Sequence, residues 1–584
     1  MEQYDLAVLG GGPAGYFAAE RAASGGLKTA LFEAEKLGGV CLNEGCIPTK
    51  VMLNSSKLLY YAKNGSTYGI RASVGAGGNA GVGAGVGTSG SAGVGAVSSA
   101  GGSAGVGTSG SAGSGAGVGA NVGVSIRASV GAVSGAGGSA GSGAAEFSID
   151  HAAVMSRKEK IVRTLVAGVR SKLKASGADV FMGRAFVSAR TGCGYTVEQQ
   201  TGADAGRQIE AKRILIATGS EPVIPPIDNI RGHLDSGYLI TSREALSLAE
   251  VPKRIVIVGG GVIGLELADY FNSAGAHVTV VELLDRVASP MDIEISGILL
   301  AHLKKRGVEF RLGRLFTEIT QTGGNGGGNG IVVVTSKGGA SGGAAAASAN
   351  RGTSTSANGG ASGGAAAAPT TQHARGSASD VEFLPADKVL VSIGRKPCVS
   401  GTGLAELGLY TERGAVVTDD CMRTNLPGVY AAGDVNGKSM LAHTAYREAD
   451  VAVSHMLGEP CFMRYDAIPS VIYTNPEAAG VGETEESAAE KGLDVKAVKL
   501  SMRFSGRYIA EAEGGDGICK VIFNKHTGGV IGAHIIGTYA SEIISSAAFM
   551  VECKWPVAAL RELVFPHPTV GEVLRDALFA YQEG

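Results

Sequence analysis

Short apolar runs alternate with segments of helical periodicity along most of the chain. The apolar runs have the length and the β-branched content of buried strands, and the periodic segments that follow them have the length of helices. Expected strands lie at residues 5–9, 29–32, 254–258 and 277–281, and expected helices at residues 14–21 and 265–273. Strands that alternate with helices predict parallel sheets and the α/β class of fold.

Two long segments break this pattern. Residues from about 73 to 145 are almost entirely Gly, Ala, Ser and Val, and a second such block runs from about 323 to 379. Too few large apolar side chains are present to offset the conformational entropy that folding removes. We therefore expect two disordered low-complexity insertions, with a flexible tether or a partner-binding loop as the functional alternative.

Length and charge exclude several classes of protein. The 584 residues suffice for three or four domains, and the formal net charge of −2 offers no electrostatic basis for binding nucleic acid or a membrane surface. No apolar run reaches the roughly 18 residues that a membrane span needs. The first strand begins almost at the N-terminus and leaves no room for a signal peptide, so we expect a soluble, cytoplasmic protein.

A glycine-rich loop joins a strand to a helix at two places. Both loops read Gly-x-Gly-x-x-Gly, and an acidic residue follows 18 positions after the last glycine. Such glycines let a pyrophosphate approach a helix N-terminus closely, and the acid accepts hydrogen bonds from a ribose. The two sets are Gly10, Gly12, Gly15 and Glu33, and Gly259, Gly261, Gly264 and Glu282. They predict two dinucleotides and electron transfer between them.

Cys41 and Cys46 stand five positions apart. In a straight helix this step rises about 7.5 Å, which is too far for a disulfide, so a bond between the two needs a bend that Gly45 allows. Pro48 suits the first turn of a helix, where backbone N–H groups favour a thiolate at Cys46. Two buried free thiols are the alternative for this pair. The other six cysteines are far apart, which indicates structural thiols and no metal site.

One segment identifies the family that the chain resembles. Residues 37–50 read Leu-Gly-Gly-Val-Cys-Leu-Asn-Glu-Gly-Cys-Ile-Pro-Thr-Lys and closely resemble the active-site segment of the FAD-dependent pyridine nucleotide-disulfide oxidoreductases. The resemblance implies that Cys41 and Cys46 form a redox-active disulfide. It also implies that the first glycine loop binds FAD and that the second binds a nicotinamide cofactor.

The same resemblance implies further cofactor-binding residues. Lys50 and Glu266 match an ion pair beside the flavin, for which an ordinary surface salt bridge is the alternative. Glu282 favours NAD over NADP, because a carboxylate repels a 2′-phosphate and no arginine cluster follows it. The remaining residues implied in this way are Thr218, Gly219, Gly394, Asp434, Ala442 and His443.

His567 stands between two prolines, and Glu572 follows five residues later. A lone histidine is usually structural. This one resembles the family's catalytic pair, in which the glutamate orients the ring and the histidine acts as the base.

Residues 282–286, 440–443 and 468–477 most resemble the dihydrolipoyl dehydrogenase branch of the family. The implied reaction oxidises dihydrolipoamide and reduces NAD. The dihydrolipoamide would be carried on a lipoyl domain of a 2-oxoacid dehydrogenase or glycine cleavage complex. A glutathione- or mercuric-reductase-like enzyme, or a flavin-binding structural subunit with vestigial catalysis, is the alternative.

The sequence departs from the family at three places. Val40 stands where a threonine is usual, and Phe565 with Pro566 replaces His-Ala. Glu44 stands where a small apolar residue is common, and its charge is expected to raise the pKa of Cys41. These changes bear on the rate more than on the reaction.

The resemblance implies four domains and a homodimer. The expected boundaries are 1–225 for the FAD domain, 226–395 for the NAD domain, 396–464 for a central domain that contacts FAD, and 465–584 for an α+β dimer-interface domain. The apolar stretch at residues 543–551 suits a two-fold interface, and His567 is expected to serve the active site of the other subunit.

Overall fold

The computed structural model describes residues 1–70, 147–192, 194–322, 330–337, 380–512 and 515–582. The chain divides into two compact units, of which the smaller spans residues 62–148 and the larger contains all other residues. In the smaller unit, the described part includes a short 3-10 helix at Gly65–Tyr68. The insertion expected at 73–145 lies outside the described residues.

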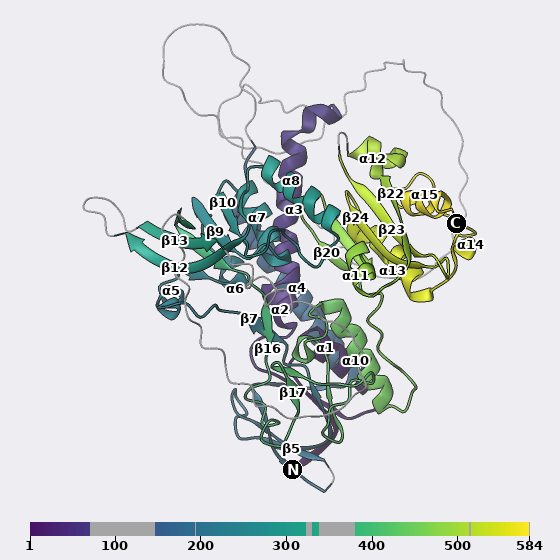
Figure 1. Cartoon of the computed structure of the whole chain (residues 1–584). Helices are drawn as coiled ribbons and strands as arrows, with labels where there is room; N and C mark the ends of the chain where they lie inside the picture. Colours follow the sequence, from purple (N-terminus) through teal and green to yellow (C-terminus); the bar gives the residue numbers. More distant parts are fainter. Residues whose placement is uncertain (71–146, 193, 323–329, 338–379, 513–514, 583–584) are drawn as a thin grey trace, which may run out of the picture. The chain divides into compact units, whose positions relative to one another are not determined.

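The first sheet has seven strands in the order β3-β2-β1-β6-β5-β4, with β19 also paired to β6 (Figure 1). Strands β3, β2, β1 and β6 run parallel to one another, β19 runs parallel to β6, and β5 and β4 are antiparallel additions. The strands are β1 (Glu2–Leu9), β2 (Thr29–Glu33), β3 (Asp179–Met182), β4 (Ala185–Arg190), β5 (Tyr195–Gln199), β6 (Gln208–Ile216) and β19 (Val429–Ala431).

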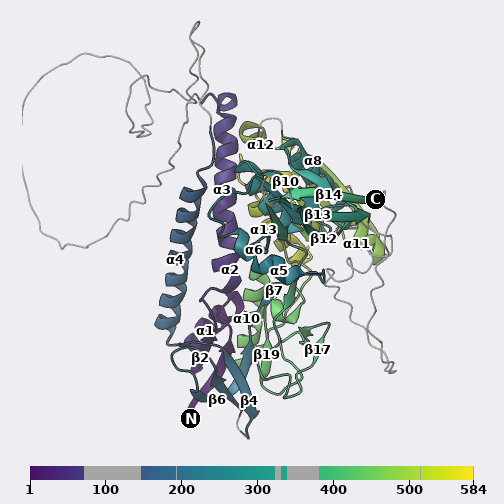
Figure 2. The same ribbon diagram turned by 90° about the vertical axis from the view of Figure 1, so that its left-hand side faces the viewer.

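The helices of this region are α1 (Pro13–Ser24), α2 (Gly39–Glu44), α3 (Cys46–Lys63), α4 (His151–Ser176) and α10 (Ala442–Met456). Alanines on one face of α1 pack with apolar residues of α10 in a single buried cluster. The long helices α3 and α4 (Figure 2) share a second cluster through Met52, Leu53, Val154 and Met155. The apolar periodicity of these helices therefore builds the core that supports the redox segment at the start of α3.

The second sheet is fully parallel, in the order β11-β10-β9-β15-β8. Its strands are β8 (Leu239–Ile240), β9 (Arg254–Val258), β10 (His277–Val281), β11 (Glu309–Arg311) and β15 (Lys388–Val391). Helices α7 (Val262–Ser273) and α8 (Ile293–Lys305) accompany it, and the short helices α5 (Ile230–Asp235) and α6 (Ser242–Ala245) precede β9. The strands expected at 254–258 and 277–281 are confirmed.

A three-stranded antiparallel sheet corrects the second predicted insertion. Strand β13 (Gly330–Lys337) pairs with both β12 (Arg314–Thr322) and β14 (Val381–Ala386). The prediction of disorder from 323 to 379 was therefore wrong for residues 330–337. Their run of β-branched residues pairs on both sides, and Val333 is fully buried. The rest of that predicted insertion lies outside the described residues.

The C-terminal sheet is antiparallel, in the order β20-β21-β24-β23-β22, which confirms the predicted α+β domain. Its strands are β20 (Ser470–Ile472), β21 (Ala478–Gly482), β22 (Val495–Ser501), β23 (Ile518–Asn524) and β24 (Val530–Ile536). Helices α13 (Ala540–Cys553) and α15 (Glu572–Ala580) pack on it, with the short helices α11 (Glu485–Glu490), α12 (Gly506–Glu511) and α14 (Val557–Leu560) nearby in sequence.

The apolar stretch at residues 543–551 lies differently from the prediction. Most of its apolar side chains, including Ile543, Ile544 and Met550, are buried in the core of their own sheet. Only Phe549 is open, at 54% exposure. The helical period turns the apolar face inward, so the stretch itself does not form a two-fold surface.

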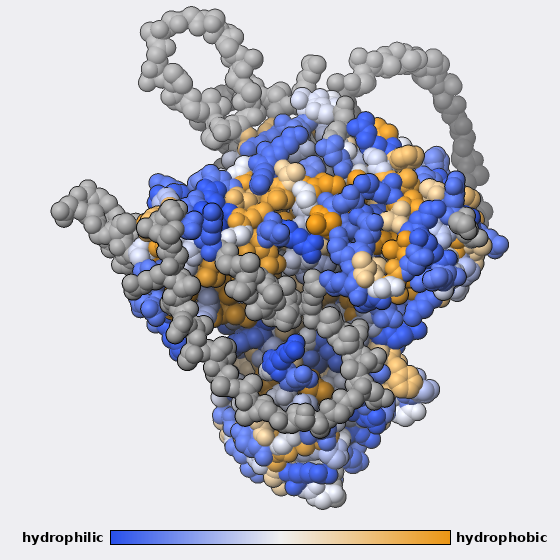
Figure 3. Space-filling view, in the orientation of Figure 1, coloured by the Kyte–Doolittle hydropathy of each residue, from blue (hydrophilic) through white to orange (hydrophobic). Residues whose placement is uncertain are grey.

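Smaller pairings complete the fold. Strand β7 (Ser220–Pro222) pairs with β16 (Arg395–Pro397), and β17 (Thr411–Glu412) pairs with β18 (Ala415–Val416). Strand β19 and helix α10 come from the predicted central domain but pack with the first sheet, and the four domain boundaries stay a prediction. On the face in view in Figure 3, apolar and polar surface are interspersed. Within the described ranges, no helix has the length and apolarity to cross a bilayer.

The β13–β14 hairpin generates a prediction. Lys337 and Asp380 close its paired end with an ion pair at 3.5 Å, so replacing residues 338–379 by Asn-Gly joins neighbouring strand ends. Each doubling of loop length costs only about 0.6 kcal/mol of closure entropy, so the shortened chain should unfold at the same or a slightly higher temperature. Differential scanning calorimetry measures this, and a clear fall in the midpoint would show that the removed segment packs on the body.

Candidate active site

The redox segment bends between two helices. Helix α2 ends at Glu44, Gly45 breaks the helical path, and α3 begins at Cys46, so the predicted bend and the position of Pro48 in the first turn are confirmed. A Cβ on Gly45 would lie 3.0 Å from the carbonyl oxygen of Val40, so a larger residue crowds the turn. The turn brings the two cysteines together as free thiols that share a hydrogen bond.

That hydrogen bond shifts the pKa values of the two thiols in opposite directions. Accepting it from Cys41, helped by the charge of Lys50, lowers the pKa of Cys46 to about 7, against the opposing effect of burial. Donating it, together with burial, raises the pKa of Cys41. Near pH 7 Cys46 is therefore about half ionised, and any thiolate of the pair lies on Cys46 while Cys41 stays a thiol.

Glu44 does not act as the sequence predicted. Its carboxylate is paired with the Nε of Arg243, and a terminal nitrogen (Nη2) of the same guanidinium binds Glu35. The pKa of Cys41 is raised, but the causes are its hydrogen bond to Cys46 and burial rather than Glu44.

Lys50 and Glu266 form the predicted ion pair. The Nζ of Lys50 lies 3.0 and 2.9 Å from the two carboxylate oxygens of Glu266, whose side chain is only 4% exposed. The backbone N–H of Tyr473 donates to the same carboxylate at 3.0 Å, and Lys50 lies over the Tyr473 ring. This pair joins α3 to α7 and to the C-terminal segment, so it is more than a surface salt bridge.

The two glycine loops have the same local structure. Gly10 and Gly259 adopt φ of 106° and 111°, which only glycine accepts readily. A Cβ on Gly15 would meet the carbonyl oxygen of Gly10 at 1.7 Å, and one on Gly264 would meet that of Gly259 at 2.0 Å. These four glycines are therefore required for the strand to turn into its helix.

The acid of each loop supports the loop that precedes it. A carboxylate oxygen of Glu33 accepts the Gly11 N–H at 2.7 Å, and one of Glu282 accepts the Gly260 N–H at 2.6 Å. A Cβ built on Gly261 would meet no other atom within 4 Å. A Cβ built on Gly12 would meet only the Cα of Gly39, at 3.8 Å. The middle glycines thus leave the helix N-termini of α1 and α7 open, as an incoming pyrophosphate needs.

Residues 217–219 pack over the first glycine loop, and residues 392–394 pack over the second. A Cβ on Gly10 would meet the Ala217 carbonyl oxygen at 2.3 Å, and one on Gly259 that of Ser392 at 2.5 Å. The Thr218 hydroxyl donates to the Cys398 carbonyl, and Gly219 and Gly394 both have positive φ.

Asp434 belongs to a polar group that the sequence did not reveal. The Ser220 hydroxyl donates to Asp434 at 2.5 Å, and Arg395 donates to the hydroxyl and the carbonyl oxygen of Ser220. Within the described part of the chain, Arg395 pairs with no carboxylate, so its guanidinium keeps capacity for an anion. Buried Glu448 holds the preceding Gly433 through its N–H at 2.6 Å. These partners come from distant segments, which no local motif signals.

His567 and Glu572 are paired as predicted. The Nδ1 of His567 donates to the carboxylate of Glu572 at 3.0 Å, while the ring itself is 79% exposed. Glu572 also accepts the Thr569 N–H and a hydrogen bond from Arg575. The Thr569 hydrogen bond, followed by that of His567, lowers the pKa of Glu572. Across the described ranges, no contact joins His567 to either redox cysteine of its own chain.

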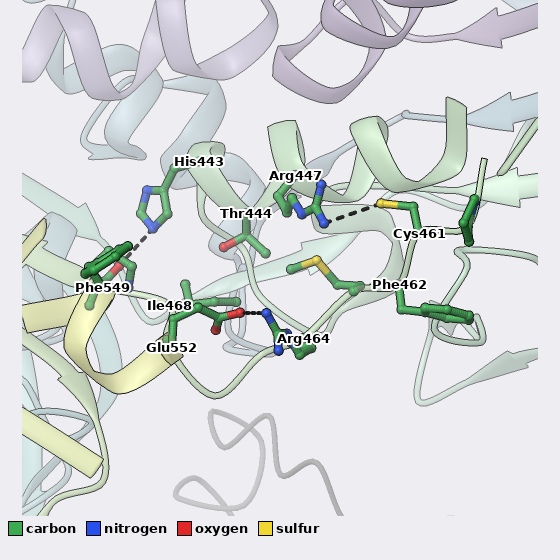
Figure 4. A pocket seen from close by; sticks show the side chains of 14 residues that line it. His443, Thr444, Arg447, Cys461, Phe462, Arg464, Ile468, Phe549 and Glu552 are labelled. Carbon is green, nitrogen blue, oxygen red and sulfur yellow. Dashed lines mark hydrogen bonds and ion pairs between the residues drawn. The ribbon is translucent and has the colours of Figure 1, made fainter. Parts of the chain in front are cut away.

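His443 hydrogen-bonds to the backbone and lines a cavity. Its Nε2 donates to the Pro469 carbonyl oxygen at 2.8 Å, and burial lowers its pKa. It lines a cavity of about 720 Å³ with Arg447, Cys461 and Phe549, and neither redox cysteine lines that cavity (Figure 4). Ala442 is the first residue of α10. Cofactor contacts for these two residues stay a prediction.

The residues present fit two dinucleotides. Both loops have an open middle glycine, an acid that accepts a loop N–H, and a helix N-terminus; Glu33 is buried and Glu282 is half-buried. Val40, Val262 and Ile393 expose apolar surface beside them, at 38–40% exposure. Among the residues described, no group of three or more His, Cys, Asp or Glu side chains is arranged to hold a metal ion.

Comparisons with known proteins agree with this geometry. The chain is 32% identical to the dihydrolipoyl dehydrogenase of Chlorobaculum tepidum over 99% of this chain and 97% of the relative. It is also 30% identical to that of Bacillus subtilis over 99% and 98%. Among solved structures, LpdA from Mycobacterium tuberculosis has a TM-score of 0.71 at 21% identity over 99% of both chains, which supports the fold.

Two family matches cover most of the chain. Residues 4–449 match the pyridine nucleotide-disulphide oxidoreductases, and residues 468–578 match the dimerisation domain of the same family. With the glycine loops and the cysteine turn, these matches show that the chain belongs to the pyridine nucleotide-disulphide oxidoreductase family.

Proposed function

We propose that the chain is a dihydrolipoyl dehydrogenase, which oxidises dihydrolipoamide to lipoamide at the Cys41–Cys46 pair and reduces NAD with FAD as the intermediate carrier. The observation that carries the proposal is the redox turn, in which one hydrogen bond separates two thiols in acidity. The relatives named dihydrolipoyl dehydrogenase support the substrate.

The chain's own residues perform a thiol–disulfide exchange. In the oxidised enzyme Cys41 and Cys46 are joined, and a thiolate of dihydrolipoamide attacks the sulfur of Cys41, so that Cys46 leaves as a thiolate. The second substrate thiolate then attacks the substrate sulfur of the mixed disulfide, which closes the disulfide of lipoamide and releases Cys41 as a thiolate that takes up a proton. Two electrons and two protons have moved from substrate to protein. The low pKa of Cys46 makes it the better leaving group.

His567 is the proposed base for the substrate thiol. Glu572 holds the ring by its Nδ1, which leaves Nε2 free to accept a proton. Because the ring is exposed and touches neither cysteine of its own chain, we assign it to the active site of the partner in a homodimer.

The loop around Gly12 with Glu33 would hold FAD, and the loop around Gly261 with Glu282 would hold NAD. When bound, FAD supplies the two-electron transfer from the cysteine pair to NAD. Asp434 suits the polar chain of FAD, and the guanidinium of Arg395, which pairs with no carboxylate of the described residues, suits its phosphates. Lys50, held by Glu266, sits one helical turn from Cys46 and favours its thiolate.

The physiological substrate is proposed to be the lipoyl group of a 2-oxoacid dehydrogenase or glycine cleavage complex. The cytoplasmic location stays a prediction.

Anaerobic titration of the purified enzyme with dihydrolipoamide tests the function. We expect a long-wavelength absorbance band from a thiolate next to the oxidised flavin, half-developed near pH 7 and lost as the pH falls and Cys46 is protonated. Steady-state assays should show NADH formation. Turnover of glutathione disulfide or mercuric ion with no turnover of dihydrolipoamide would overturn the proposal.

Two glycine substitutions separate packing from cofactor binding. Gly264→Ala places a Cβ 2.0 Å from a backbone oxygen, so it should lower the unfolding temperature and weaken NAD binding. Gly261→Ala meets no protein atom, so the variant should fold normally, while the methyl group blocks the pyrophosphate and raises KM for NAD at least tenfold, about 1.4 kcal/mol. KM for dihydrolipoamide serves as the control. An unchanged KM for NAD in Gly261→Ala would place the dinucleotide elsewhere.

Mixed dimers test the position of His567. Cys41→Ser and His567→Gln homodimers should both be nearly inactive, for want of a nucleophile and of a base. A heterodimer purified with two tags has one site with both residues intact if the histidine acts in the partner, so about half of the wild-type activity should return. No recovery in a verified heterodimer would mean that His567 acts within its own chain.

A further inference from the structure

An arginine that pairs with two glutamates lies next to the redox turn. Arg243, on the short helix α6, binds Glu44 through its Nε and Glu35 through a terminal nitrogen. Glu35 follows β2 of the first sheet, and Glu44 is the last residue of α2. One guanidinium therefore joins the segment between β8 and β9 of the second sheet to both ends of residues 35–44, which lead into the cysteine turn.

Glu44 is placed where its charge matters. Only Gly45 separates it from Cys46, and its side chain is 21% exposed, whereas that of Glu35 is 61% exposed. Both Glu44 and Cys46 lie within electrostatic reach of the same half-buried guanidinium, that of Arg395. A free carboxylate at position 44 would therefore oppose the formation of a thiolate on Cys46.

Other groups also set the field at Cys46. From the elements packed around it these are Cys41 of α2, Lys50 of α3, Glu266 of α7, Arg395 of β16, Tyr446 of α10 and Tyr473. The positive charges among them are Lys50 and Arg395, and Lys50 is already paired with Glu266. In the proposed function Arg395 binds the phosphates of FAD, so in the FAD-loaded enzyme neither cation would be left to compensate an additional negative charge at position 44.

We propose that Arg243 is a positioning residue of the redox turn, which pairs with Glu44 and neutralises its carboxylate so that this charge does not oppose a thiolate on Cys46. The proposal rests on the role of Cys46 in the proposed function. It explains how a chain with an acid at this position retains a working cysteine pair, because the arginine that compensates the acid lies 199 residues later in the sequence.

The test is a set of variants of the FAD-loaded full chain: Arg243→Gln, Arg243→Lys, Glu44→Gln, Glu35→Gln and the double variant Arg243→Gln/Glu44→Gln. Each is reduced anaerobically with dihydrolipoamide, and the pH midpoint of the long-wavelength thiolate–flavin band is measured. The unfolding temperature of each variant is recorded alongside.

Arg243→Gln removes the cation that neutralises Glu44, so the pH midpoint of the band in this variant should rise by about half a pH unit or more. Arg243→Lys keeps the charge and should stay near wild type. Glu44→Gln leaves a guanidinium with one carboxylate fewer, so its midpoint should stay or fall. Glu35→Gln, the matched control, removes the more exposed carboxylate, farther along the sequence from the cysteines, and should not move the midpoint. The double variant should return to wild type.

Restoration in the double variant is the decisive result, because a merely structural salt bridge would stay broken there. An unchanged midpoint in Arg243→Gln, or a raised midpoint that Glu44→Gln fails to correct, would overturn the proposal. If Arg243→Gln does not fold, a Glu44→Gln midpoint above that of wild type would overturn it, and one at or below wild type would support it. A wild-type enzyme without the band would instead refute the assignment of Cys46 in the proposed function.

Discussion

The ion pair between Lys50 and Glu266 is the contact on which the active-site geometry depends. Glu266 is a buried carboxylate, and its partners are the ammonium group of Lys50 and the backbone N–H of Tyr473. Removing one partner of a buried pair costs about 3–5 kcal/mol, because the other charge stays desolvated. The carboxylate thus holds three distant segments together: the redox helix, the helix of the second dinucleotide loop and the strand-end of the C-terminal sheet.

Helix α7 repeats this arrangement one turn later. Asp269, fully buried, binds Arg306 at 2.5 Å and accepts the Asn475 N–H at 3.1 Å. Residues three apart share a helix face, so Glu266 and Asp269 both accept backbone N–H groups of one extended segment, from Tyr473 and Asn475. Two such attachments fix the rotation of α7 as well as its position. The open N-terminus of α7, with Gly261, is thereby oriented relative to the turn that carries Cys46.

Local patterns predicted the parts of the site whose cause is local. The glycine loops, the bend at Gly45 and the His567–Glu572 pair depend on residues a few positions apart, and the structure contains all of them. The group of Ser220 and Arg395 around Asp434 escaped prediction because its members meet only through folding. Strand β13 escaped because its glycine-rich flanks masked a short β-branched run. The apolar stretch of α13 was recognised as apolar, but composition does not say which way a helix face turns.

The chemistry and the low-complexity sequence occupy opposite ends of the elements that carry them. Helix α3 begins at Cys46, and its 18 residues span about 27 Å before the chain enters the first Gly- and Ala-rich segment. The second segment connects the ends of β13 and β14, and an ion pair joins these two strand ends. At both places a described element near the segment is held by core contacts, through Leu53 of α3 with α4 and through Val333 within its sheet. The turn at Cys46 lies at the other end of α3, where Lys50 and Glu266 fix it. A change in the length of the first Gly- and Ala-rich segment can therefore affect this turn only through the packed helix α3.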